Sequence, residues 1–109
     1  MRHKLGKKQE LFIVTIYNWM NNMDNRYDAG SCTDAALRGE KLKTLVERIE
    51  DSHIYKLTDE GIAAAKELIS TGAFAVRENG RTYKWKRTFR IADRPASWKD
   101  DNDTRIINL

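Results

Sequence analysis

The order of apolar and polar positions predicts a small protein built from helices and short strands. Residues 11–23 are apolar on nearly every side, a pattern that favours a helix, although its first half would also suit a buried strand. The positions that fit one helical face are Phe12, Ile16, Trp19, Met20 and Met23. A helix apolar on so many sides needs cover beyond one facing layer, either from a second copy in a homodimer through these residues or from a central place in the chain's own core.

A second helical region follows a polar loop. Ser31, with Asp34 three residues later, predicts a capping box, and Gly39 then interrupts the helical pattern. A glycine inside a helix costs about 1 kcal/mol, so two short helices, 31–38 and 40–51, are favoured over one continuous helix. The apolar positions of the later helix recur at i, i+3, i+4 and i+7, as Leu42, Leu45, Val46 and Ile49.

Next the pattern predicts a short strand and a third helix. Residues 53–57 read as the strand, and the Thr58 hydroxyl can cap a helix over 59–71 whose first charges, Asp59 and Glu60, suit its dipole. Gly72 fits the left-handed position that ends such a helix.

Asn79-Gly80, between two strand-like runs, predicts a type I′ hairpin turn. A two-residue loop would place Phe74 opposite Trp85 and put the apolar residues of both strands on one side. The other side would be a basic ladder, so one face of the hairpin is predicted to join the core and the other to carry cations in water.

Length and composition suit one domain. At 109 residues the chain has room for a single core, expected over 1–91 with a basic N-terminal arm, and 92–109 reads as an extended polar tail. Trp98 and the terminal 106–109 are apolar enough to dock, on their own domain or on a partner. No run is long and apolar enough for a membrane span and no secretory signal is evident, so a cytoplasmic protein is expected.

The candidate chemistry excludes most enzyme classes. Two histidines and one cysteine without partner motifs offer no converging catalytic groups, so no catalytic residue, cofactor or metal is predicted. Charge is more informative. The net charge is only +4, but residues 1–9 hold four cations and no acid, and residues 81–94 hold six cations against one acid. A basic ribbon can follow a row of phosphates, although charged hairpin faces also serve solubility.

The order helix, short helix, Gly39, helix, strand and basic hairpin resembles the winged helix-turn-helix proteins. The local resemblance includes Leu45, Ile49, Ile54 and the run 55–61, Tyr-Lys-Leu-Thr-Asp-Glu-Gly. It implies an α+β, winged-helix-like domain of three to four helices with a short strand and a C-terminal β-hairpin. In the usual order the wing comes directly after the recognition helix, whereas here a whole helix separates the predicted wing from 40–51.

The resemblance implies that helix 40–51 enters the major groove of double-stranded DNA and that the hairpin lies along the backbone. The predicted groove contacts are Lys41, Lys43, Thr44 and Arg48. The predicted wing contacts are Arg77, Asn79, Arg81 and Lys84, with Lys86 and Arg90 on the same basic ladder. The expected function is a non-enzymatic DNA-binding regulator of transcription or replication. The alternative is a protein-interaction module or small inhibitor that binds a partner through the first helix and the tail.

Overall fold

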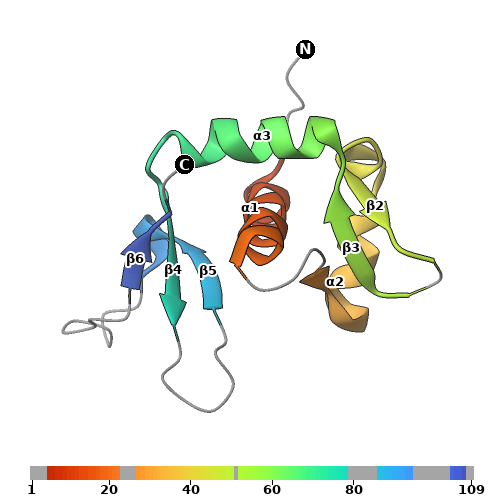
Figure 1. The fold of residues 1–109 in the computed structure, drawn as a ribbon, viewed down its shortest axis with the longest axis horizontal. Helices are drawn as coiled ribbons and strands as arrows, with labels where there is room; N and C mark the ends of the chain where they lie inside the picture. Colours follow the sequence, from red (N-terminus) through yellow and green to blue (C-terminus); the bar gives the residue numbers. More distant parts are fainter. Residues whose placement is uncertain (1–4, 23–26, 51, 79–85, 95–103, 108–109) are drawn as a thin grey trace.

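The computed structural model of the protein describes residues 5–22, 27–50, 52–78, 86–94 and 104–107. These residues form an α+β fold, as predicted, in which helix α1 lies between two small antiparallel sheets and α3 passes beside it toward both (Figure 1). The first half of the chain contains α1 (Lys7–Asn22), β1 (Tyr27–Asp28), α2 (Gly30–Leu37), the 3-10 helix η1 (Glu40–Leu42), β2 (Val46–Arg48) and β3 (Ile54–Leu57). The second half contains α3 (Asp59–Ile69), β4 (Phe74–Glu78), β5 (Lys86–Arg90), the 3-10 helix η2 (Ile91–Asp93) and β6 (Thr104–Ile106).

The central position of α1 explains why its sequence is apolar on so many sides. Ile13 and Ile16 are fully buried in one core with the first sheet, while Val14 is fully buried in a second core with Phe74 and Ile69. The chain's own core therefore covers these faces of the helix, and Ile16 is fully buried in it. Phe12 and Met20 are half-buried against the same core, Trp19 meets the Tyr27 ring edge-on, and Met23 lies outside the described residues.

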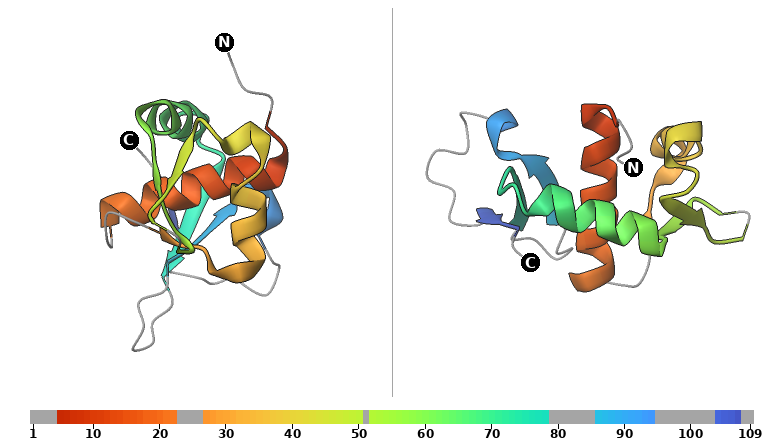
Figure 2. Two further views of the ribbon diagram at one scale, coloured as in Figure 1. Left: turned by 90° about the vertical axis from the view of Figure 1, so that its right-hand side faces the viewer. Right: turned by 90° about the horizontal axis from the view of Figure 1, so that it is seen from above.

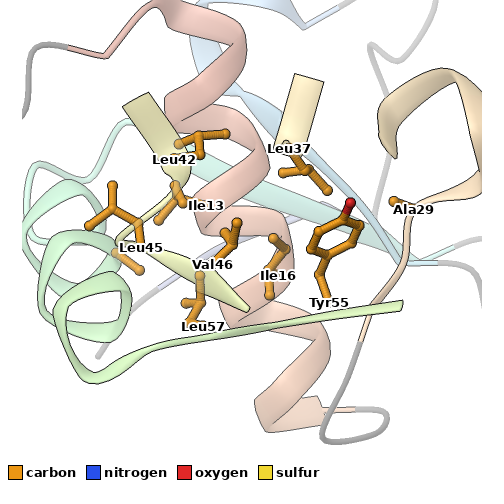
Figure 3. Packing of buried hydrophobic residues seen from close by; sticks show 10 residues of the cluster. Ile13, Ile16, Ala29, Leu37, Leu42, Leu45, Val46, Tyr55 and Leu57 are labelled. Atoms are coloured by element: carbon orange, nitrogen blue, oxygen red, sulfur yellow. The ribbon is translucent and has the colours of Figure 1, made fainter. Parts of the chain in front are cut away.

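The first sheet has the strand order β1-β3-β2 and packs on one side of α1. Its registers pair Tyr27 with Tyr55 and Val46 with Leu57. Figure 3 shows how the inward side chains of the sheet meet α1 and α2. The buried apolar residues of this core are Ile13, Ile16, Ala29, Leu37, Leu42, Leu45, Val46, Tyr55, Leu57 and Ala65.

The predicted helix 40–51 is wrong. After the turn at Gly39 the chain makes only the three-residue 3-10 helix η1 and a turn over 43–45, and then becomes strand β2. Leu42, Leu45 and Val46 are buried, as the helical spacing predicts. A short helical turn followed by a strand buries the same three residues equally well. Val46 pairs with Leu57 across β2 and β3, so a contact distant in sequence overrides the local period.

Helix α2 begins one residue earlier than predicted and without its capping box. Ala29 is the N-cap residue and makes no side-chain capping bond, while the Asp28 carboxylate accepts a hydrogen bond from the Gly30 N–H at 3.2 Å. The Asp34 side chain instead turns toward β3, where it accepts a hydrogen bond from the Tyr55 hydroxyl. The side chain that the capping box required is therefore used for a buried hydrogen bond between α2 and β3.

The predictions for the strand at 53–57 and for helix 59–71 are confirmed. Strand β3 covers Ile54–Leu57, and α3 covers Asp59–Ile69. The Thr58 hydroxyl caps α3 by accepting a hydrogen bond from the Gly61 N–H at 3.1 Å. Gly72 has a φ of 71°, the left-handed conformation predicted at the end of this helix.

The second sheet corrects the predicted hairpin register. Phe74 pairs with Arg90 and Glu78 with Lys86, so the connection spans seven residues, 79–85, and not the two-residue turn at Asn79-Gly80. These seven residues lie outside the described part of the chain. The shift is five positions, an odd number, and therefore exchanges the two faces of the second strand. Arg90 now shares a face with Phe74, and Phe89 lies opposite Ala75.

A third strand completes this sheet, whose order is β5-β4-β6. Strand β6 comes from the segment that the sequence predicts as an extended tail, and it pairs Ala75 with Ile106. Ile107 is buried against Val14 and Phe74, so part of the apolar terminus docks on the chain's own second core.

The turn between β2 and β3 contains a backbone conformation that glutamate rarely adopts. Glu50 is exposed and has a φ of 53°, in the left-handed region that costs a non-glycine residue about 1 kcal/mol. Asparagine tolerates this region better, so we expect Glu50→Asn to raise the free energy of unfolding by roughly 0.5 kcal/mol. Urea denaturation followed by circular dichroism measures this change. Glu47→Asn, on the neighbouring strand, should give no gain, and equal stabilities of Glu50→Asn and the wild type would contradict the prediction.

Candidate nucleic-acid interface

The residues between α2 and β2 form a short exposed ridge, which we call the η1 segment (residues 40–45). Lys41, Lys43 and Thr44 are exposed, as expected for groups that reach a ligand. Leu42 and Leu45, in contrast, are fully buried and anchor the segment to the first core (Figure 3). The structure therefore brings together three of the predicted groove contacts on a turn with a fixed backbone, although not on a helix.

Thr58 and Gly61, which follow β3, contact the backbone at the end of the η1 segment. The Thr58 hydroxyl donates a hydrogen bond to the Thr44 carbonyl at 2.6 Å, and the Thr58 N–H donates to the Leu45 carbonyl at 3.0 Å. Gly61 is buried against the same carbonyl, because a Cβ at this position would lie only 1.9 Å from the Leu45 oxygen. One threonine thus caps α3 and fixes the end of the η1 segment, and one glycine allows the close approach.

The hairpin of β2 and β3 follows the η1 segment directly. Arg48 is half-buried on β2 and pairs in register with Tyr55. Lys56 lies 3.6 Å from Glu47, with both side chains about half exposed, so this ion pair contributes little to stability. The turn itself carries Glu50, Asp51 and His53 and no lysine or arginine. A lysine or arginine of this hairpin can therefore contact phosphate only from the strands, and Arg48 on β2 is the predicted one.

A charged cluster that the sequence did not reveal joins α2 to this hairpin. Asp34 is almost fully buried and accepts hydrogen bonds from the Tyr55 hydroxyl on Oδ1 and from Arg38 Nη2 on Oδ2, the latter at 2.9 Å. His53 Nδ1 lies 3.5 Å from the same Oδ2. The Tyr55 hydrogen bond, with smaller contributions from Arg38 and His53, holds the pKa of Asp34 below its ordinary value. Burial, followed by the bond to Asp34, raises the pKa of Tyr55.

Only one part of this cluster could have been found in the sequence. Asp34 and Arg38 are four residues apart on a helix, which is the spacing of an ion pair. His53 and Tyr55 join the cluster through the pairing of β3 with β1 and β2, and that pairing leaves no local signal.

Of the other predicted DNA contacts, the described ones belong to β4 and β5. The sheet β5-β4-β6 and the sheet β1-β3-β2 flank α1 on opposite sides (Figure 1), so the groove contacts and these described residues do not form one surface. Arg77 is half-buried on β4, and the backbone of Lys86 lies in β5. Asn79, Arg81 and Lys84 lie outside the described residues.

Arg90 is not part of a cationic strip in water. Its guanidinium is ion-paired with Glu10 in the first turn of α1 and lies 4.8 Å from the centre of the Phe74 ring. Only 19% of its side chain is exposed. The predicted place of Arg90 on a solvent-facing basic ladder is therefore wrong, because the register shift turns this residue toward α1.

Other cations lie on the same side of the molecule as the η1 segment. Lys7 and Lys8 are exposed in the first turn of α1. Figure 2 shows in both views that the beginning of α1, η1 and η2 lie toward one edge of the molecule. Lys7 and Lys8 and the basic residues of the η1 segment can therefore face one extended polyanion.

No known protein family, curated protein or solved structure matches this chain. Within the residues that the structure describes, the helices lack the length and apolar composition that crossing a membrane requires.

Proposed function

We propose that the protein binds double-stranded DNA without catalysing a reaction and regulates transcription or replication. The observation that carries the proposal is the order α1, β1, α2, η1, β2, β3 with the strand order β1-β3-β2. This order is similar to that of a winged helix-turn-helix domain. The η1 segment occupies the place of the recognition helix, and the β2–β3 hairpin follows it directly, as a wing does.

This assignment replaces the wing inferred from the sequence. The hairpin at 74–90 is separated from the η1 segment by α3, whereas the β2–β3 hairpin is continuous with it. Lys41, Lys43, Thr44 and Arg48 keep their proposed roles as DNA contacts. A three-residue 3-10 helix reaches fewer base edges than a full recognition helix, so we expect phosphate contacts to dominate and sequence specificity to be modest.

Charge reversal of the η1 segment tests the proposal. We expect Lys41→Glu/Lys43→Glu to lower the affinity for a random-sequence duplex at least tenfold at low salt, and to flatten the salt dependence, because two phosphate contacts are lost. Fluorescence anisotropy at two salt concentrations measures both effects.

The matched control is Lys56→Glu/Lys66→Glu, which changes the net charge equally at exposed positions on β3 and α3. Equal losses in the two double variants would mean that net charge alone governs binding. No salt-dependent binding by the wild type would overturn the proposed function.

A protein-interaction module remains the second candidate, favoured by the acidic turn of the β2–β3 hairpin and by two exposed apolar side chains. Ile106 is 55% exposed on β6, and Ile91 is 38% exposed. The first helix, which the sequence offered for this role, has Ile13, Val14 and Ile16 buried in the chain's own cores. The same titration separates the candidates, because a protein that binds only other proteins shows no salt-dependent retention of DNA.

A further inference from the structure

We propose that Arg38 and His53 together bind one phosphate group of the DNA backbone and that Asp34 is the residue that positions them. The proposal rests on the proposed function and adds a contact to it. Neither residue belongs to the predicted interface, and both lie beside it, since Arg38 directly precedes Gly39 and η1 while His53 directly precedes β3.

The geometry of the cluster places two cationic groups side by side at the surface. Arg38 Nη2 and His53 Nδ1 both lie within ion-pair distance of the same oxygen, Oδ2 of Asp34, at 2.9 and 3.5 Å. The side chains of Arg38 and His53 are 51% and 50% exposed, whereas that of Asp34 is 8% exposed. The carboxylate therefore lies beneath the two groups and leaves half of each in contact with solvent.

The cluster is held rigidly enough to act as a preformed site. The Tyr55 hydroxyl, which is itself buried, donates to the other carboxylate oxygen and fixes Asp34 between α2 and β3. Because the pKa of Asp34 is lowered, this carboxylate stays ionised throughout the neutral range and holds both partners there. Because Asp34 already holds Arg38 in place, this side chain loses less conformational entropy on binding than a freely rotating arginine would.

The donors that remain match the oxygens of a phosphate. Arginine has five N–H donors in a planar fork, and Asp34 takes one of them in the bond at 2.9 Å. With Nδ1 of His53 facing the carboxylate, its second ring nitrogen can donate to a phosphate only when the imidazole is protonated. The charged groups around His53 in this cluster are Asp34 from α2 and Arg38 at its C-terminal cap, and the neutral, titratable hydroxyl of Tyr55 from β3 contacts the same carboxylate. Protonation of the imidazole therefore completes the site, and phosphate binding is expected to strengthen as the pH falls.

The test measures the affinity of the full chain for a random-sequence duplex of about 20 base pairs, at two salt concentrations and at about pH 6 and about pH 8. Arg38→Gln should weaken binding about tenfold at low salt and reduce the magnitude of the salt slope by about 1. His53→Gln should weaken binding severalfold at the lower pH only and thereby remove the pH dependence. His3 is the other histidine of the chain, and a His53→Gln variant that keeps the full pH dependence of the wild type would contradict the role of His53.

Two controls separate the proposed site from effects of charge and folding. Lys56→Gln removes one positive charge from the opposite face of β3, next to Tyr55 in sequence, and should change the affinity little. Arg38→Lys keeps the charge but not the planar fork, so it should restore part of the affinity that Arg38→Gln loses.

A separate arm asks whether the site also takes free phosphate. Titration with millimolar inorganic phosphate, followed by the His53 ring proton resonances, should cause much smaller changes than the duplex does, because neighbouring contacts hold the DNA phosphate in place. Saturation by inorganic phosphate together with no response to duplex would overturn the assignment to DNA.

The outcomes distinguish the two proposals. If the wild type fails to bind duplex, the proposed function fails. If the wild type binds but Arg38→Gln and His53→Gln behave like Lys56→Gln at both pH values, the phosphate site is overturned while the proposed function stands.

Discussion

Replacement of Gly61 by alanine is expected to lower the free energy of unfolding by about 3 kcal/mol. A Cβ on this residue would lie 1.9 Å from the Leu45 oxygen and 2.9 Å from its carbonyl carbon. Both atoms belong to the backbone, so no side-chain rotation relieves the overlap, and α3 or the turn over 43–45 must move. A domain of this size has only about 5–15 kcal/mol of stability, so the loss is a large fraction of the total.

Urea denaturation, followed by tryptophan fluorescence and circular dichroism, measures this loss. Gly6→Ala is the matched control, because a Cβ there meets only the end of the Gln9 side chain at an ordinary 3.6 Å. We expect that variant to lie within about 0.5 kcal/mol of the wild type. A Gly61→Ala protein as stable as the Gly6→Ala protein would show that α3 does not depend on this close approach.

The same substitution connects stability to the proposed interface. Thr58 and Gly61 hold the backbone of Thr44 and Leu45, and these residues end the η1 segment. Movement of α3 away from Leu45 would therefore disturb the ridge that carries Lys41 and Lys43. The loss of DNA affinity should then exceed the effect of removing any single cation that lies elsewhere.

Helices α1 and α3 could be predicted because the signals that start, continue and end them are local in the sequence. Helix α1 extends over sixteen residues without a turn signal, and α3 has a threonine cap, two acids in its first turn and a left-handed glycine after its end. Each of these features acts within a few residues of the chain. Their bounds were predicted to within a few residues for the same reason.

The segment 40–51 could not be predicted because two structures satisfy its pattern. Leu42, Leu45 and Val46 are buried either on a helical face or on a turn followed by a strand. The choice depends on the pairing of Val46 with Leu57, which is eleven residues away. The hairpin register failed in the same way, since the turn signal at Asn79-Gly80 was outweighed by a sheet that brings Arg90 to Glu10 on α1.

The sequence predicted the residues of the candidate site that are identified by exposure alone. It missed the residues that are brought together by tertiary contacts. Lys41, Lys43 and Thr44 are exposed as the polar positions of their segment required. The sequence pattern did not indicate the β2–β3 hairpin that we propose as the wing, because it predicts a helix where the chain forms η1 and β2. The Asp34 cluster combines one helix with a strand about twenty residues later, so no local rule could have assembled it.

Removal of the hydrogen bond between Tyr55 and Asp34 is expected to have the second large effect on stability. Tyr55 is 1% exposed, and its hydroxyl donates to an ionised carboxylate that is itself buried. Tyr55→Phe leaves that carboxylate oxygen without its donor, which costs roughly 2 kcal/mol for a bond to a charged group. Urea denaturation at neutral pH measures this cost, and Tyr17→Phe, on α1 and half-buried, is the matched control.

The pH dependence of stability identifies the carboxylate that is responsible. The pKa of Asp34 is lower in the folded protein than in the unfolded chain, chiefly through the Tyr55 bond, so Asp34 stabilises the fold above its unfolded pKa of about 4. That contribution is lost as the pH falls through the lower, folded value. Asp34→Asn has no carboxylate at this position, so it lacks this pH-dependent contribution to stability at every pH. Its stability should therefore lie below that of the wild type at neutral pH and approach it in acid.

Tyr55→Phe should give an intermediate curve, because Arg38 and His53 still favour the ionised carboxylate after the tyrosine hydroxyl is gone. Stability profiles measured in urea between about pH 7 and about pH 3 distinguish these cases. Parallel profiles for the wild type and Asp34→Asn would mean that other carboxylates govern the acid response. Convergence of the two profiles, with Tyr55→Phe between them, would establish that the bond between β3 and α2 is electrostatic in origin, because apolar packing alone has no reason to respond to protons in this range.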